Sequence, residues 1–120
     1  MATILIVEDS QTEKEILATY LSSEGHTVLH AGSSEEALTT LENNKPNVIF
    51  LDVVLPGRSG FELCRDLKAE PDTSAIPIVM CSTKSSQMDK FWGMKQGADA
   101  YLTKPLDRTE VLETTRKVLA

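Results

Sequence analysis

Polar side chains that can do chemistry follow four of the apolar runs in this chain of 120 residues. They are Glu8 and Asp9, then Asp52, then the pair Ser82 and Thr83, and finally Lys104. Taken singly, each has an ordinary structural explanation, because acids often precede helices and Ser-Thr pairs are common in turns. Taken together they supply three carboxylates, two hydroxyls and an ammonium, and the carboxyl ends of parallel strands meet at one edge of a sheet.

Three carboxylates that lie side by side call for a cation, because like charges at short range repel strongly. The ligands that the chain offers there are carboxylate oxygens and a backbone carbonyl, since no cysteine or histidine follows directly on an apolar run. Such oxygen ligands favour Mg²⁺, with Mn²⁺ as the alternative ion, over Zn²⁺. Ca²⁺ usually takes more protein oxygens than this set provides.

Asp52 interrupts the most apolar stretch of the chain, VIFLDVVLPG. An unpaired charge in such a stretch would be costly. With a divalent ion and Lys104 beside it, Asp52 would stay ionised and could act as a nucleophile. The natural electrophile is a phosphoryl group, whose oxygens would meet the metal, the Lys104 ammonium and the Ser82 hydroxyl.

The elements that must position these side chains alternate along the chain. Apolar runs of strand length are Thr3–Val7, Thr27–Ala31, Asn47–Leu51, Pro77–Cys81 and Asp99–Thr103. Amphipathic segments of helical length begin near Gln11, Ser33, Ser59, Ser86 and Asp107, and the first four end before Gly25, Asn43, Pro71 and Gly97. The stretches Ser33–Glu36 and Asp107–Glu110 have the pattern of a capping box.

This alternation predicts an α/β fold with a parallel sheet covered by helices on both faces. The central runs are continuously apolar, as expected for strands buried on both faces. Five units are too few for a closed eight-stranded barrel, which leaves an open doubly wound sheet. Ligands bind such sheets at the carboxyl ends of the strands, near a topological switch point.

Length and composition favour one compact domain over residues 1–120. The net charge of −6 and the pI of about 4.8 disfavour nucleic-acid binding, because the surface would repel phosphate backbones. No stretch has the character of a signal peptide, a membrane span or a basic membrane-surface helix. Cys64 and Cys81 lie among apolar residues without a metal-binding spacing, so buried, inert thiols and a cytoplasmic location are expected.

The chain resembles the receiver domains of two-component response regulators, of the single-domain CheY-like kind. The resemblance rests on ILIVEDS, VIFLDVVLPGRSGFEL, IPIVMCSTK and GADAYLTKPLD, which match in order and span the whole chain. It implies a flavodoxin-like sheet of five strands in the order 2-1-3-4-5. It also implies a phosphorylation-activated signalling switch rather than an enzyme with outside substrates.

The resemblance assigns a role to each acidic position. Asp52 would accept the phosphoryl group from the phosphohistidine of a sensor histidine kinase. Asp9 would ligate Mg²⁺ directly, Glu8 through a water and Val54 through its backbone carbonyl. Glu8 stands where Asp is commoner in the family, and its extra methylene suits the water-mediated role. The apolar Val54 side chain cannot orient a hydrolytic water, which predicts a long-lived acyl phosphate.

The resemblance also assigns the polar positions on the later strands. The Ser82 hydroxyl would bind the phosphoryl group, and the Lys104 ammonium would form an ion pair with it. The peptide bond between Lys104 and Pro105 would be cis. Thr83 stands where Ala or Gly is commoner and would crowd the phosphoryl pocket. Tyr101 falls on the aromatic switch position, so phosphorylation would draw Ser82 toward the phosphoryl group and turn Tyr101 inward.

Within the family, TSAIPIVMCSTK and DKFWGMKQGADAYLTKPLD look most like the PilH-type regulators of type IV pilus chemosensory systems, which govern twitching motility. Output is then expected from binding an unidentified downstream protein through the fourth helix, fifth strand and fifth helix. Candidate contact residues on that surface are Lys90, Trp92, Lys95 and Tyr101. The helical spacing predicts an inward stripe of Phe91, Met94 and Ala98, with Trp92 beside it as either a packing residue or a partner anchor.

Three rival functions use similar residues. A receiver that works only as an unphosphorylated scaffold is weakened by the competent chemistry at every matched position. A phosphatase of the haloacid-dehalogenase type would need an acid two residues after the nucleophile, where Val54 stands. Binding of FMN would need a phosphate loop after the first strand, and the acidic EDSQTEKE would repel phosphate.

Overall fold

The computed structural model describes residues 1–120, in which five strands alternate with five helices. The strands are β1 (Thr3–Val7), β2 (Thr27–Ala31), β3 (Val48–Asp52), β4 (Ile78–Ser82) and β5 (Ala100–Thr103). The helices are α1 (Gln11–Ser22), α2 (Ser34–Asn43), α3 (Gly60–Ala69), α4 (Gln87–Lys95) and α5 (Arg108–Leu119). Each predicted element is present, with small shifts at its ends.

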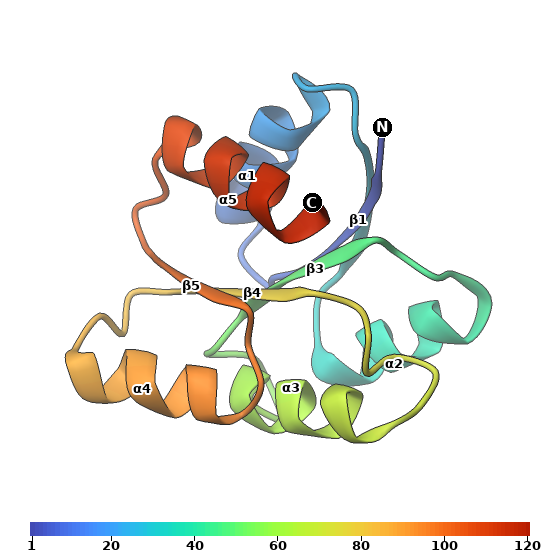
Figure 1. Ribbon diagram of the computed structural model, residues 1–120, viewed down its shortest axis with the longest axis vertical. Helices are drawn as coiled ribbons and strands as arrows, with labels where there is room; N and C mark the ends of the chain where they lie inside the picture. Colours follow the sequence, from blue (N-terminus) through green and yellow to red (C-terminus); the bar gives the residue numbers. More distant parts are fainter.

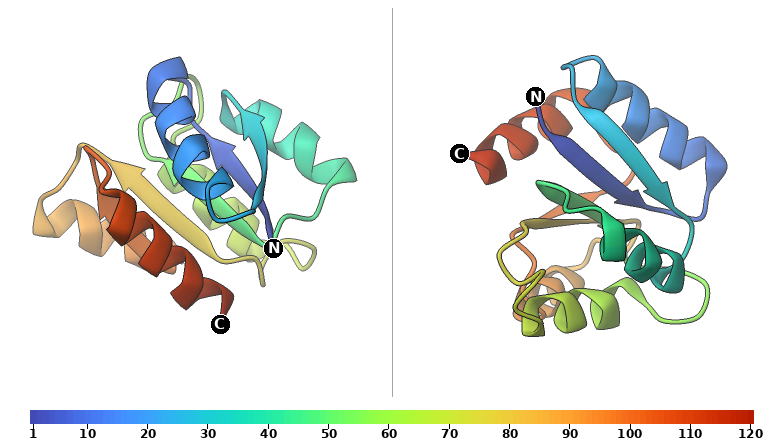
Figure 2. Two further views of the ribbon diagram at one scale, coloured as in Figure 1. Left: turned by 90° about the horizontal axis from the view of Figure 1, so that it is seen from above. Right: turned by 90° about the vertical axis from the view of Figure 1, so that its right-hand side faces the viewer.

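All five strands are parallel and lie in the order β2-β1-β3-β4-β5, which confirms the predicted doubly wound sheet. The sheet lies between two layers, with α1 and α5 on one face and α2, α3 and α4 on the other (Figure 1). The arrowheads of β1 and β2 point the same way in the right-hand view of Figure 2. The carboxyl ends of the strands therefore meet at one edge.

Alternate side chains of the central strands pack into two separate hydrophobic cores, because successive residues of a strand point to opposite faces of the sheet. On β1, Ile4 and Ile6 join the core under α1 and α5, whereas Leu5 and Val7 join the core under α2 and α3. Every residue of β3 and β4 is buried, as the continuous apolar runs predict. The strand β3 includes Asp52 as its last residue, so the carboxylate lies within the sheet rather than after it.

Capping boxes start two of the helices, but not the two for which the sequence predicts them. Ser33 and Asp107 accept hydrogen bonds from the third helical residue of α2 and α5, but the reciprocal bond that completes a capping box is absent from both. Complete capping boxes instead start α3, at Ser59, and α4, at Ser86. The prediction of boxes on α2 and α5 was wrong because the side chain of the third residue there does not return to the cap.

The orientation of α4 also differs from the prediction. Gly93 is its only buried residue, while Phe91 and Met94 are 60% and 47% exposed. A β-carbon on Gly93 would lie 2.9 Å from the Tyr101 ring and 3.0 Å from Met80 Sδ, so the helix approaches the sheet on its glycine. This close approach turns Phe91 and Met94 outward, and Ala98, which is buried, lies beyond the end of the helix.

None of the helices has both the length and the apolar character needed to cross a bilayer. Cys64 and Cys81 are buried free thiols, as predicted. Burial raises the pKa of the Cys64 thiol to about 11 and that of Cys81 further still. Both thiols therefore stay protonated and unreactive near neutral pH.

Candidate phosphoryl-acceptor site

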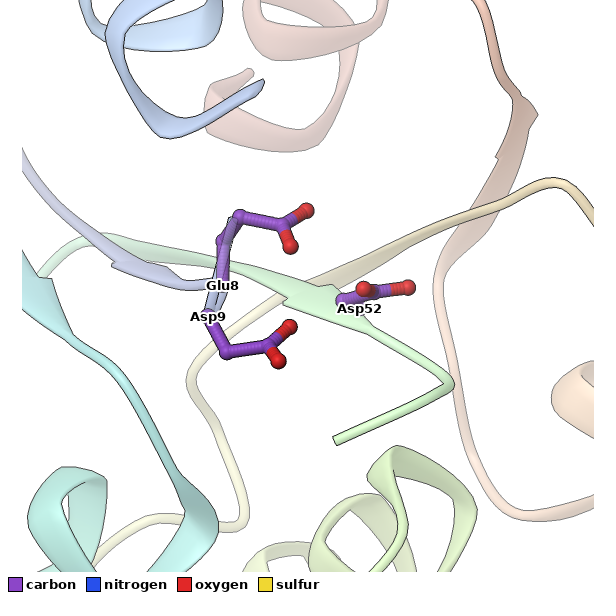
Figure 3. Close-up of side chains that lie close together, drawn as sticks. All are labelled: Glu8, Asp9 and Asp52. Atoms are coloured by element: carbon purple, nitrogen blue, oxygen red, sulfur yellow. The ribbon is translucent and has the colours of Figure 1, made fainter. Parts of the chain in front are cut away.

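Three carboxylates gather at the carboxyl ends of the two central strands β1 and β3. Glu8, Asp9 and Asp52 can each offer an oxygen such that the three atoms lie within 4.8 Å of one another. In Figure 3 the carboxylates of Glu8 and Asp9 extend toward the side on which Asp52 lies. Glu8 and Asp52 are 5% and 7% exposed, whereas Asp9 is open to solvent. One edge of the cluster is therefore accessible, and two of its charges are almost dry.

Lys104 brings the only positive charge into this cluster. It follows β5, and its side chain crosses the end of β4 to place Nζ 2.6 Å from Glu8 Oε1 and 3.3 Å from Asp52 Oδ2. Its side chain is 6% exposed. The Lys104–Pro105 peptide bond is cis, as the resemblance implied. A buried ammonium between two buried carboxylates gives each charge the partner that burial requires.

Burial and the Lys104 ammonium shift the pKa of Asp52 in opposite directions. Burial and the nearby Glu8 charge raise the pKa of Asp52 to about 6, and the Lys104 ammonium limits that rise. Burial would lower the pKa of Lys104, but its hydrogen bonds to Glu13 and Glu8 and the charge of Asp52 raise it instead. Near neutral pH the site therefore holds an ionised carboxylate beside a protonated lysine, the state that nucleophilic attack needs.

The loop after Asp52 brings the start of α3 back against the backbone of Asp52, where only glycine fits. Val54 N donates to Asp52 Oδ1 at 3.4 Å, while the Val54 side chain is 56% exposed. At the start of α3, a β-carbon on Gly60 would collide with the Asp52 carbonyl oxygen. Gly60 therefore lets α3 pack directly on the acceptor residue. Sequence patterns did not predict this role of Gly60, because a close approach across the loop leaves no local pattern.

Ser82 and Tyr101 both hydrogen-bond to the backbone of Lys84. Ser82 is fully buried, and its Oγ accepts a hydrogen bond from Lys84 N at 3.1 Å. Tyr101 donates its hydroxyl to the Lys84 carbonyl at 2.6 Å, and its ring packs on the core under α3 and on Gly93. Thr83 is exposed between them. The turn after β4 thus joins the two positions that the resemblance linked as a switch.

The remaining predicted residues lie on the outer face of α4. Lys90, Trp92 and Lys95 are exposed, and Trp92 retains half of its surface. They belong to the helix that covers Tyr101 rather than to the carboxylate cluster. The structure therefore divides the predicted set into a site at the strand ends and a surface on α4.

The residues at the strand ends fit a hard divalent cation. The donor set consists of carboxylate oxygens, of which Asp9 is exposed and able to reach an ion from solvent. Glu8 and Asp52 share Lys104 as their positive partner and Asp9 has none, so the cluster keeps a net negative charge. Oxygen donors with an open side suit Mg²⁺, which retains several waters when bound to proteins.

A cavity of about 190 Å³ connects this cluster with the surface between α1 and the segment after β5. Asp52 and Lys104 line its inner end, and apolar side chains including Ile16, Tyr20 and Leu106 line its walls. The buried carboxylate therefore borders a cavity with mostly apolar walls.

The chain matches the model of the response regulator receiver domain over residues 4–116 and belongs to this family of signalling proteins. Receiver domains bind Mg²⁺ through acidic residues and are phosphorylated by histidine kinases. Its similarity to individual proteins extends over nearly the whole chain.

The chain is similar to Protein PilH of Pseudomonas aeruginosa, with 44% identity over 120 residues that span 100% of this chain and 99% of PilH. It is also similar to the phosphate regulon regulatory protein PhoB of that organism, with 39% identity spanning 98% of this chain but 51% of PhoB. The solved structure of chemotaxis response regulator CheY4 of Vibrio cholerae matches with a TM-score of 0.92 and 31% identity, covering 99% of each chain.

Proposed function

We propose that this protein is a switch that accepts a phosphoryl group on Asp52 from the phosphohistidine of a sensor histidine kinase. The observation that carries the proposal is the Asp52 carboxylate, 7% exposed, held between two further acids and the Lys104 ammonium. We further propose that residues 1–120 act as one receiver unit in the cytoplasm and signal by binding a downstream protein.

The transfer needs little from the protein beyond position and charge. An Asp52 carboxylate oxygen attacks phosphorus, the bond from phosphorus to the histidine nitrogen breaks, and that nitrogen keeps the electron pair. Lys104, already 3.3 Å from Asp52, would neutralise one phosphoryl oxygen. The buried Ser82 hydroxyl, which accepts a hydrogen bond from Lys84 N, would donate its own proton to another phosphoryl oxygen.

Asp9 and Asp52 would hold Mg²⁺ directly, with Glu8 acting through a water and Val54 through its carbonyl. When bound, the ion neutralises charge on the phosphoryl group and on the acids around it. Glu8 is already hydrogen-bonded to Lys104, which suits an indirect role toward the ion.

The proposal is tested by incubating the protein with acetyl phosphate and Mg²⁺ and measuring its intact mass. We expect a gain of one phosphoryl group that is absent from Asp52→Asn and abolished by EDTA. A folded wild-type protein that gains no mass would instead support the unphosphorylated scaffold. Continuous turnover of outside phosphoesters would support a phosphatase.

The exposed Val54 side chain gives a second test, of the lifetime of the phosphorylated form. Val54 lies beside the acceptor but has no group that can orient an attacking water. We expect phosphorylated Val54→Asn to lose its phosphoryl group faster than wild type, followed by mass spectrometry after removal of the donor. Equal or slower decay in the variant would refute this role.

The output surface that we propose comprises α4, β5 and α5. Trp92, Lys90 and Lys95 are exposed on α4, and Tyr101 connects that helix to the turn that holds Ser82. Movement of Ser82 toward a phosphoryl group would free the turn at Lys84 and change how Tyr101 and α4 pack. If Trp92→Ala unfolds the domain but leaves partner affinity per folded molecule intact, Trp92 is not a partner anchor.

The similarity to PilH over the whole chain supports a role in a chemosensory system that controls motility or taxis. The kinase and the downstream protein would then be members of such a system. Co-purification with and without beryllofluoride, a stable mimic of the phosphoryl group, would identify the proteins that distinguish the two states.

A further inference from the structure

Lys104 has a third acidic partner that does not belong to the carboxylate cluster. Glu13, in the first turn of α1, places Oε2 2.8 Å from Lys104 Nζ, closer than the 3.3 Å that separates Nζ from Asp52. With Glu8 at 2.6 Å, Glu13 supplies one of the two hydrogen bonds that Lys104 makes. Glu13 is not among the acids whose oxygens converge on one point.

We propose that Glu13 is a positioning residue that holds Lys104 in its resting place and competes with the incoming phosphoryl group for it. An ammonium has only three N–H donors, and here they face Glu8, Glu13 and Asp52. Lys104 makes hydrogen bonds to Glu8 and Glu13 but lies 3.3 Å from Asp52 without one, so Nζ must move away from those two carboxylates to bond a phosphoryl group on Asp52 closely. This inference rests on the proposed function of Asp52.

Glu13 is the partner that can be released at the lower cost. Its side chain is 40% exposed, so water can solvate the carboxylate when the ion pair opens. Glu8 is 6% exposed at its side chain and would be left as a buried, unpaired charge. The ion pair with Glu13 is therefore the one that opens, and its strength sets how readily Lys104 turns to the phosphoryl group.

The position of Glu13 on α1 is fixed by the packing of that helix. Glu13 precedes the buried residues Leu17 and Leu21 at intervals of four, so it lies on the face of α1 that packs on the sheet. It also borders the cavity that leads to Asp52. Any donor that reaches Asp52 by this route passes the Glu13 carboxylate.

The test compares three variants on α1 by phosphorylation and by nuclear magnetic resonance. Glu13→Gln removes the charge, and Glu13→Asp keeps the charge but shortens its reach by one methylene. Glu15→Gln is the matched control, because Glu15 is exposed and its side chain bonds only Gln11 on its own helix. Each protein is phosphorylated with acetyl phosphate and Mg²⁺, and the nitrogen resonance of the Lys104 ammonium is recorded without metal or donor.

We expect both Glu13 variants to be phosphorylated about 1.4- to fivefold faster than wild type, as one weakened ion pair implies. The Lys104 ammonium resonance should shift and exchange faster with solvent in both, and neither should change in Glu15→Gln. Unchanged phosphorylation and an unchanged Lys104 resonance in Glu13→Gln would overturn the inference. So would a Glu13→Asp variant that behaves as wild type in both, since charge alone would then explain the effect.

Failure of the proposed function gives a different result. If wild type is not phosphorylated on Asp52 at all, the proposed function fails, whatever the resonance shows. If wild type is phosphorylated but the Glu13 variants match it in rate and in the Lys104 resonance, only the role of Glu13 fails.

Discussion

The strand ends of this protein bury charged side chains, whereas the outer face of α4 exposes apolar ones. Each region reverses the usual placement of such residues. At the strand ends Glu8 and Asp52 carry charge in an almost dry environment. On α4, Met88 and Phe91 expose 72% and 60% of their surfaces to water. Buried charges and exposed apolar groups are the informative exceptions in a folded protein. Both regions are therefore better explained by function than by stability.

The two regions differ in whether the chain supplies the missing partner. Lys104 compensates the buried acids from within the fold, although the cluster still keeps an excess of negative charge. No element of the chain covers Phe91 and Trp92, because Gly93 is the residue on which α4 approaches the sheet. The first region is completed by an ion and a phosphoryl group under the proposed function, and the second by another protein.

The largest effect on stability should come from removing the compensating lysine. Lys104→Met leaves Glu8 and Asp52 buried without a positive partner, so we expect the free energy of unfolding at pH 7 to fall by about 3 kcal/mol. Urea denaturation measures this change. The control is Arg116→Gln, which removes the exposed pair of Arg116 and Glu24, whose nitrogen and oxygen lie 2.7 Å apart.

The control should change the free energy of unfolding by less than about 1 kcal/mol, because exposed ion pairs contribute little. Equal losses in Lys104→Met and Arg116→Gln would mean that burial does not distinguish the site from the surface. The contrast between the two regions would then lose its energetic basis.

A smaller, pH-dependent effect should come from removing the acceptor charge. Because the pKa of Asp52 is raised from 3.8 to about 6, the folded protein binds this proton more tightly than the unfolded chain does. The resulting stabilisation is fully present below pH 3.8 and is lost as pH rises through about 6. Above that pH the ionised carboxylate disfavours the folded state by roughly 2 kcal/mol.

Without metal, we therefore expect Asp52→Asn to be more stable than wild type at pH 7, by roughly 2 kcal/mol. The difference should shrink steadily between about pH 6 and pH 4, because the asparagine amide cannot titrate whereas the Asp52 carboxyl becomes neutral. Urea denaturation of both proteins in EDTA across this range measures it. A difference that stays constant with pH would contradict the assignment of a raised pKa to Asp52.

The smallest effect on stability should come from the exposed apolar face. Phe91→Ala removes a ring that is 60% exposed, so we expect a change in the free energy of unfolding within about 0.5 kcal/mol. The matched control is Phe50→Ala on β3, where the ring is 1% exposed and its loss should cost about 3 to 5 kcal/mol. A large loss in Phe91→Ala would show that this face packs within the fold rather than serving a partner.

The sequence allowed the meeting of Asp52 and Lys104 to be predicted because both lie at the carboxyl ends of parallel strands. Once the alternation of strands and helices indicates a doubly wound sheet, its strand ends converge without further information. The resemblance to receiver domains then supplied the strand order and the role of each position. The acidic cluster followed in the same way from Glu8 and Asp9 at the end of β1.

The contacts that the sequence did not reveal are those made by side chains across elements. The inward stripe expected of Phe91 and Met94 failed because hydrophobicity was taken as a sign of burial, whereas Gly93 makes the close contact. Glu13 was missed, although its spacing of four before Leu17 placed a carboxylate on the buried face of α1. Its partner Lys104 lies 91 residues away in the chain, so no local pattern joins them.

The most direct measurement of the central claim locates the phosphoryl group itself. After reaction with acetyl phosphate and Mg²⁺, borohydride reduction converts an aspartyl phosphate to homoserine, and peptide mass spectrometry reports its position. The account predicts homoserine at position 52, no homoserine at Asp9, and no trace at Glu8 of the alcohol one methylene longer that a glutamyl phosphate would give. Homoserine at another position, or none in a protein that is folded and metal-bound, would contradict the account.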